Sequence, residues 1–203
     1  MNLKPTVVLI LMCFSSAMGY AQVSVGGNLS AIIPVGEARD YIEDTYSPGI
    51  DLLYELNKKW AIGAGGSYYK TNVNYDGIDG NYVLSPWAIS GYYNIGKNKW
   101  KPFMAVGVAA FWTEIHVKLD RGIKIDTEDW FFGHSIKLGN SYLFNKKWSV
   151  KGFIDVGTFY LRNTHNIKFF KQAITDDDLR NSVFPRSTTF ASLNLGLYYR
   201  FGK

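Results

Sequence analysis

The sequence predicts an all-β protein, an eight-stranded antiparallel up-and-down transmembrane β-barrel. Short turns rich in lysine and asparagine recur just before Trp60, Trp100 and Trp148, which are 40 and then 48 residues apart. This spacing suits two strands of about ten residues with one tight turn and one longer loop. Stretches that alternate apolar and polar residues flank each turn, as strands with one lipid face and one lumen face require.

Residues 1–21 are predicted to be a secretory signal peptide, which leaves 22–203 as the barrel domain. Lys4 precedes an apolar core at 6–16, and Gly19 and Ala21 are small residues suited to cleavage before Gln22. The apolar core is too short for a transmembrane helix, which needs about 20 residues. Cys13 is the only cysteine and lies in this leader, which excludes disulfides and cysteine-based sites from the mature chain.

The composition fits a barrel despite a mean hydropathy of −0.09, because half of each barrel strand is polar. Aromatic residues make up 16% of the chain, and the formal charge is +5. Many of the lysines lie at the three tight turns: Lys58, Lys59, Lys97, Lys99, Lys101, Lys146 and Lys147. They mark one rim beside lipid headgroups rather than a contiguous patch, so no nucleic-acid partner is expected.

The first four strands are expected at 22–33, 49–56, 60–70 and about 87–95. Pro34 ends the first, and Pro86 near the start of the fourth must lie at a bulge or above the paired region. A loop rich in glycine, aspartate and asparagine is expected at 72–81. The outward side chains follow the alternation, as at Leu29, Ile50 and Ile62.

The last four strands are expected at 100–115, 130–144, 148–161 and 188–201. The first of these is apolar on both faces, so its register stays open between Phe103 and Val106 as the outward side. The final strand alternates cleanly, with Leu195 toward lipid. The count gives three short turns, four long loops and both termini on the short-turn side, as in outer-membrane barrels.

Two acidic segments in the loops are weighed as cation sites. Residues 76–81 (Asp-Gly-Ile-Asp-Gly-Asn) lack the spacing and terminal glutamate of an EF-hand loop and are interpreted as a solvated turn. The run at 176–178 (Asp-Asp-Asp) is interpreted as a solvated loop, with binding of divalent ions that bridge lipopolysaccharide phosphates as the alternative. His116, His134 and His165 have no metal-ligand spacing, and no cofactor or metal is expected.

The C-terminal strand carries a family resemblance. Residues 194–201 fit the terminal recognition pattern of outer-membrane barrels through Asn194, Gly196, Tyr199 and Phe201, although Gly202 and Lys203 follow. Residues 22–203 resemble the small OmpA/OmpX-type eight-stranded barrels of the Gram-negative outer membrane. The resemblance implies export through the periplasm, insertion by the barrel-assembly machinery, contact with outer-membrane lipids and lipopolysaccharide, and a monomeric state. An aromatic girdle is expected at Trp60, Trp100 and Trp148.

A charge network is expected in the lumen, because an eight-stranded barrel is just wide enough for side chains to fill. The alternation directs three acids and three bases inward: Asp51, Glu55, Asp155, Lys137, Lys151 and Arg200. Charges in so narrow a space must pair or keep water. A conducting or ligand-binding lumen is the alternative.

The function expected is non-enzymatic, either envelope support or presentation of surface loops. The alternatives are a lipid A-modifying enzyme of the deacylase or acyltransferase type and, less favoured, a small-solute channel. The enzyme would need a nucleophile, a base and an orienting carboxylate, for which the candidates are Ser135, His134 and either Glu128 or Asp129. Adjacent strand residues point to opposite faces, so His134 and Ser135 are not expected to share a hydrogen bond.

Overall fold

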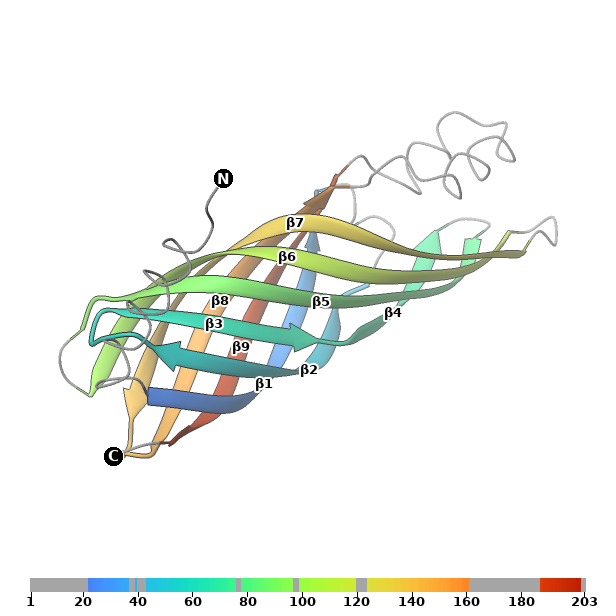
Figure 1. Ribbon diagram of the computed structural model, residues 1–203. Helices are drawn as coiled ribbons and strands as arrows, with labels where there is room; N and C mark the ends of the chain where they lie inside the picture. Colours follow the sequence, from blue (N-terminus) through green and yellow to red (C-terminus); the bar gives the residue numbers. More distant parts are fainter. Residues whose placement is uncertain are drawn as a thin grey trace, which may run out of the picture.

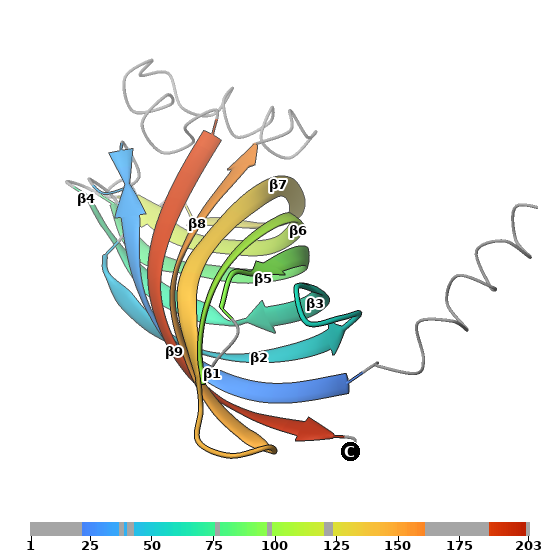
Figure 2. The same cartoon turned by 90° about the vertical axis from the view of Figure 1, so that its left-hand side faces the viewer.

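The computed structural model describes residues 22–36, 39, 43–75, 78–96, 99–119, 124–160 and 187–201. They form nine antiparallel strands around one interior (Figures 1 and 2): β1 (Gln22–Val35), β2 (Thr45–Glu55), β3 (Trp60–Ser67), β4 (Tyr69–Tyr75), β5 (Ile78–Asn94), β6 (Trp100–Leu119), β7 (Lys124–Leu143), β8 (Trp148–Tyr160) and β9 (Ser187–Phe201). Among the described residues, no helix is long and apolar enough to cross a membrane.

The ring contains eight strand positions, because β3 and β4 occupy one of them. Both pair with β5, and only Tyr68 separates them. The ring closes where β1 pairs with β2 on one side and β9 on the other, and where β3 pairs with β5. The predicted all-β, eight-stranded up-and-down barrel is therefore confirmed.

The break between β3 and β4 has a cause in the sequence of β5. The β3 ladder ends at Gly66↔Trp87 and the β4 ladder resumes at Tyr69↔Leu84, which leaves Pro86 opposite the interruption. Proline has no N–H to donate, so the ladder cannot pass through this point on that side. Pro86 still has Phe111 as its register partner on β6. Pro86 was expected at a bulge or above the paired region. In the structure it lies at a gap in the ladder between β5 and the β3–β4 position, while its ladder with β6 continues.

The tight turns show why asparagine recurs before the tryptophans. The Asn57 side-chain oxygen accepts hydrogen bonds from the backbone N–H groups of Lys59 at 2.8 Å and Trp60 at 2.9 Å. The Asn145 side-chain oxygen likewise accepts hydrogen bonds from the backbone N–H groups of Lys147 at 2.8 Å and Trp148 at 2.9 Å, at the start of β8. An asparagine that replaces a backbone acceptor in this way fixes the turn and starts the next strand.

Strand alternation separates an apolar exterior from a mixed interior. Leu29, Ile50 and Leu195 are 58, 56 and 63% exposed, whereas inward neighbours such as Ser30 and Asp51 are 3 and 6% exposed. The open register of β6 is settled, with Val106 and Val108 outward and Phe103 inward. Every strand position of the ring contributes exposed large apolar side chains, which together form a continuous belt.

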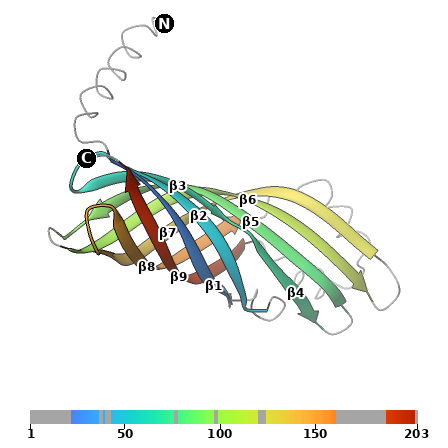
Figure 3. The same ribbon diagram turned by 90° about the horizontal axis from the view of Figure 1, so that it is seen from below.

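The long-loop end differs from expectation, since much of the predicted loop is strand. The prediction of a loop at 72–81 is wrong, because β4 continues to Tyr75 and β5 begins at Ile78. The two strands pair here from Asn72↔Asn81 to Tyr75↔Ile78. Strands β6 and β7 likewise extend to Leu119 and back from Lys124. Backbone pairing within long hairpins outweighs the turn preference of the Asp, Asn and Gly residues there. These hairpins reach beyond the other strands at one end (Figures 1 and 3).

Some sequence expectations fall outside the described residues. These are the signal peptide at 1–21, the aspartates at 176–178, residues 76 and 77 of the acidic turn, and His165.

Candidate functional site in the barrel lumen

The six charged residues expected in the lumen belong to inward positions of β2, β7, β8 and β9. Two ion pairs join them across strands. Lys137 Nζ lies 3.5 Å from Asp155 Oδ2, and their side chains are 9 and 23% exposed. Arg200 donates a hydrogen bond of 2.5 Å to Glu55 Oε1. Both pairs combine charge with burial, so each partner depends on the other for compensation.

Asp51 and Lys151 are linked differently, through a tyrosine. Tyr198 Oη donates to Asp51 Oδ2 at 2.5 Å, and Asn28 Nδ2 donates to the same oxygen at 2.7 Å. Lys151 Nζ lies 4.4 Å from the centroid of the Tyr198 ring. No basic side chain of the described residues comes within ion-pair distance of Asp51. A tyrosine with its ring toward a cation and its hydroxyl toward a carboxylate serves both groups.

Glycines make room for this arrangement. A Cβ added to Gly26 would lie 2.2 Å from the Tyr198 ring, and one added to Gly65 would lie 2.1 Å from Asp51 Oδ1. Both distances are far shorter than van der Waals contact, so only glycine allows the ring and the carboxylate to reach the wall. Glycine is therefore required at Gly26 and Gly65 by the packing of side chains in the lumen.

Sequence reasoning missed the part that three lumen residues play: Asn28, Lys101 and Tyr198. Each lies at an inward position of its strand, Tyr198 between the assigned Gly196 and Arg200. The alternation itself was a sufficient signal for Tyr198. For Lys101 the signal was obscured because β6 is apolar on both faces.

Two layers rich in aromatic side chains lie in the lumen on either side of the central charges. Toward the long-loop end, Phe159 contacts the rings of Phe111, Phe131 and Phe190 at centroid distances of 4.9, 5.9 and 5.6 Å. Toward the short-turn end, a second cluster is buried: Leu53, Ala61, Tyr92, Phe103, Ala105, Phe153 and Tyr198. The space between the layers is a cavity of about 70 Å³ that polar and apolar side chains line together.

The central cavity contains two buried oxygen atoms without a protein partner. These are Ser135 Oγ and Asp155 Oδ1, and both residues line the cavity. A cavity needs roughly 10–15 Å³ to hold one water molecule, so this one has room for more than one. Hydration of the cavity would satisfy both atoms and separate the Lys137–Asp155 pair from the apolar layers.

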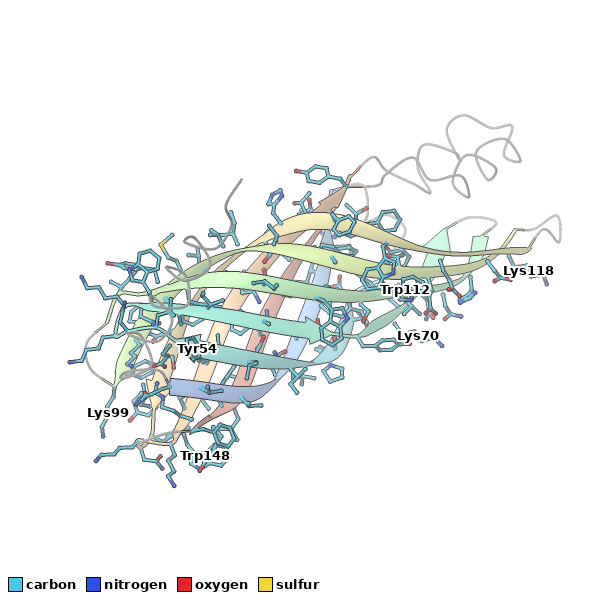
Figure 4. The ribbon with its side chains drawn as sticks, viewed as in Figure 1. Tyr54, Lys70, Lys99, Trp112, Lys118 and Trp148 are labelled. Carbon is cyan, nitrogen blue, oxygen red and sulfur yellow. The ribbon has the colours of Figure 1, made fainter. Side chains whose placement is uncertain are left out.

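The expected aromatic girdle lies at the short-turn end, where each tryptophan pairs with a tyrosine of a neighbouring strand. The ring centroids are 4.8 Å apart for Trp60–Tyr93, 4.7 Å for Trp100–Tyr142 and 4.9 Å for Trp148–Tyr199. Figure 4 shows Trp148 and Lys99 at the short-turn end of the barrel. It shows Trp112 and Lys118 toward the opposite, long-loop end. The exposed fractions of the three girdle tryptophans are 52, 60 and 41%.

A second set of aromatic side chains lies toward the long-loop end and was missed. Trp112 and Trp130 pair across β6 and β7 with centroids 5.2 Å apart. Trp87, Tyr68 and Tyr160 are more than half exposed on other strands toward that end. Paired and exposed aromatics thus border the apolar belt on both sides.

The residues of the C-terminal recognition pattern lie on β9, which pairs with β1 and β8. Asn194 is 6% exposed; it accepts a short hydrogen bond from Ser30 Oγ and donates to Ser192 Oγ at 2.9 Å. Gly196 packs beside Tyr198, whose ring atom would lie 2.8 Å from an added Cβ. Tyr199 and Phe201 contact each other edge-on at 4.8 Å. The pattern therefore divides between lumen packing and the outer rim.

The candidate catalytic residues do not converge. His134 is exposed on the outer face beside the Tyr160 ring, with centroids 5.8 Å apart. Ser135 is 5% exposed and lines the lumen. Glu128 is exposed on β7, and the side chain of Asp129 lies outside the described part of the chain. His134 and Ser135 are on opposite faces of one strand, so this pair cannot act as base and nucleophile.

Comparisons with known proteins support the fold. No family model matches the sequence, and no curated protein matches it significantly. Among solved structures, a major outer membrane protein of Thermus thermophilus is similar at a TM-score of 0.63 and 11% identity, over 89% of this chain and 99% of that one. Neisserial surface protein A gives 0.59 at 13%, over 89% and 97%. The N-terminal barrel domain of Pseudomonas aeruginosa OprF gives 0.51 at 14%, over 88% and 97%.

Proposed function

Because the chain has the fold of the small eight-stranded outer-membrane β-barrels, we propose that it is an integral outer-membrane protein with a side-chain-filled lumen and a structural or surface-interaction role. The exposed apolar belt carries this proposal. Residues such as Leu195, Val108 and Phe132 are 63, 69 and 64% exposed. A continuous patch of this kind is an aggregation liability in water, whereas a bilayer requires it.

The border of the belt supports a membrane position. Tryptophan and tyrosine are favoured at the level of the lipid headgroups, and the paired aromatics lie at both edges. Exposed lysines such as Lys99 and Lys146 follow outside the short-turn edge. This order from apolar to aromatic to charged suits membrane lipids and lipopolysaccharide as the surrounding partners.

We propose that residues 1–21 and the pattern at 194–201 direct export and assembly. Residues 1–21 would act as a cleaved signal peptide for passage to the periplasm. The pattern of Asn194, Gly196, Tyr199 and Phe201 would be read by the barrel-assembly machinery, and the barrel would be a monomer.

Outer-membrane fractionation and heat-modifiable gel migration test the proposal. We expect the chain to fractionate with the outer membrane and to migrate differently with and without boiling, because a folded barrel resists detergent. Recovery as a periplasmic protein with a single migrating form would contradict the proposal.

A conductance measurement tests the filled lumen. The aromatic layers on either side of the cavity support a filled lumen, so we expect no large, stable open state in planar bilayers. Phe159→Ala, which removes the ring shared by three aromatic contacts, is the matched opening variant. A wide, stable pore in the unmodified protein would favour the solute-channel alternative.

The extended β6–β7 hairpin supports a surface role with a pH-sensitive tip. His116 Nδ1 lies 2.8 Å from Asp126 Oδ1, and His116 Nε2 lies 3.7 Å from Glu114 Oε2, beyond the Trp112–Trp130 pair. The hydrogen bond to Asp126 raises the pKa of His116 above its usual value of 6.5. The contact therefore stabilises the tip fully below about pH 6.5 and is lost as the pH rises through the raised pKa.

Nuclear magnetic resonance titration of the His116 ring measures this effect. We expect a pKa above 6.5 in the folded protein and a lower value in Asp126→Asn, with smaller protection factors for the tip amides at high pH after the intrinsic pH dependence of exchange is divided out. An unchanged His116 pKa in Asp126→Asn would show that the contact does not form.

A further inference from the structure

The lumen near the short-turn end contains more positive than negative charge. Inward positions place three bases and one acid around a cavity of about 20 Å³: Lys101, Lys151, Arg200 and Glu55. Arg200 pairs with Glu55, which uses the only carboxylate of that cavity lining. Two ammonium groups remain there, and no carboxylate of the described residues lies within ion-pair distance of either.

The strand register brings these two lysines to opposite sides of one serine. Lys101 on β6 is the register partner of Ser141 on β7, and Ser141 is the partner of Lys151 on β8. All three point into the same cavity. Neighbouring strands are about 4.8 Å apart, so the lysine backbones stand about 10 Å apart with a hydroxyl between them.

The surroundings of the two lysines make the excess charge costly. Lys151 contacts the rings of Tyr198 and Phe103, with its Nζ 4.4 and 6.0 Å from their centroids. Ring faces attract a cation but do not neutralise it. Ser141 and Ser24, which also line the cavity, are 6 and 5% exposed and can donate hydrogen bonds inward. Two positive charges and hydroxyl donors around one small cavity are the groups that an anion requires.

We propose that this cavity binds a single small inorganic anion of halide size between Lys101, Lys151 and Ser141. The cavity is close to the volume needed for one water molecule, about 10–15 Å³, so a larger anion such as phosphate does not fit without displacement of side chains. The anion supplies one negative charge near both ammonium groups, which is the charge by which the four described lumen bases exceed the three described lumen acids. It completes the charge balance of the lumen without a second carboxylate.

Chloride-dependent stability of the full barrel tests the site. The midpoint of heat-induced unfolding, read from gel migration in detergent micelles, is measured in sodium chloride and in sodium gluconate at equal ionic strength. We expect a higher midpoint in chloride for the unmodified protein and loss of that difference in Lys151→Met. Lys146→Met, at an exposed turn position, should keep the difference.

In the unfolding experiment, the proposal is overturned by an equal midpoint in both salts for the unmodified protein or by an undiminished chloride effect in Lys151→Met. Lys101→Met is the second variant if Lys151→Met gives no folded band. A crystal grown in sodium bromide gives an independent readout, with one anomalous peak between the two lysines expected and its absence contradictory. The folded band itself reports the proposed barrel function, so failure of the site remains distinguishable from failure to form a barrel.

Discussion

We expect Lys137→Met to lower the free energy of unfolding by about 3–5 kcal/mol, because it leaves Asp155 as an uncompensated charge in the lumen. Lys137 Nζ lies 3.5 Å from Asp155 Oδ2, and the other carboxylate oxygen, Oδ1, has no hydrogen-bond partner in the protein. Methionine keeps most of the lysine stem, so the packing against Phe153, whose ring centroid is 5.5 Å from Lys137 Nζ, changes little. The effect is therefore electrostatic rather than steric. Urea unfolding of the folded barrel, followed by tryptophan fluorescence, measures it.

A double substitution distinguishes the stability contributed by the ion pair from the cost of leaving one of its charges unpaired. Lys137→Met with Asp155→Leu removes both charges, so we expect it to cost less than Lys137→Met alone. Lys146→Met at an exposed turn is the matched control and should change stability by less than about 0.5 kcal/mol. A single variant as stable as the unmodified barrel would show that the cavity solvates Asp155 as well as bulk water does.

Alternation alone was enough to assign most faces of the barrel. Leu29, Ile50 and Leu195 were assigned outward and are exposed, because a two-residue period with one apolar outer face leaves no other register. The alternation failed on β6, where Phe103 and Val106 are both apolar. There the choice depends on volume: the lumen holds the larger ring against Tyr92 and Phe153, at 5.7 and 6.1 Å, and the valine lies on the outer face.

The partners of the lumen charges could not be read from one strand at a time. Contacts between Arg200 and Glu55, or between Tyr198 and Asp51, depend on the stagger of strands that are far apart in sequence. Alternation places a residue inward without fixing its height in the barrel. Tyr198 was also assigned no role because the expected network contained only formal charges, whereas its hydroxyl donates to one charge and its ring faces another.

The loops were misjudged because composition was given more weight than pairing. The Asp, Asn and Gly residues at 72–81 favour turns locally, but long antiparallel hairpins satisfy their backbone groups. The tight turns were easier, because Asn57 and Asn145 act within four residues of sequence. Tight turns that depend on a few neighbouring residues can therefore be predicted from this sequence, whereas the lengths of the paired strands cannot.

Leu195→Arg tests the assignment of the outer face and has the second large expected effect. Leu195 lies in the middle of β9, is 63% exposed, and has Leu29 and Gly152 as register partners. An arginine near the centre of the bilayer costs about 2–4 kcal/mol in a barrel of this kind. We expect a lower folded yield on insertion into phospholipid vesicles, measured as the heat-modifiable fraction.

The depth dependence of the cost distinguishes a bilayer from a general loss of packing. Ile95→Arg is the matched control, since Ile95 is 62% exposed but lies just after β5, at the short-turn end. Near the interface the cost of arginine falls to about 0–1 kcal/mol, so this variant should insert almost normally. Equal losses at both positions would reflect disturbed folding without a bilayer contribution. A normal yield for Leu195→Arg would mean that this face of β9 does not meet lipid, because a hydrocarbon environment leaves the guanidinium no partner for its charge.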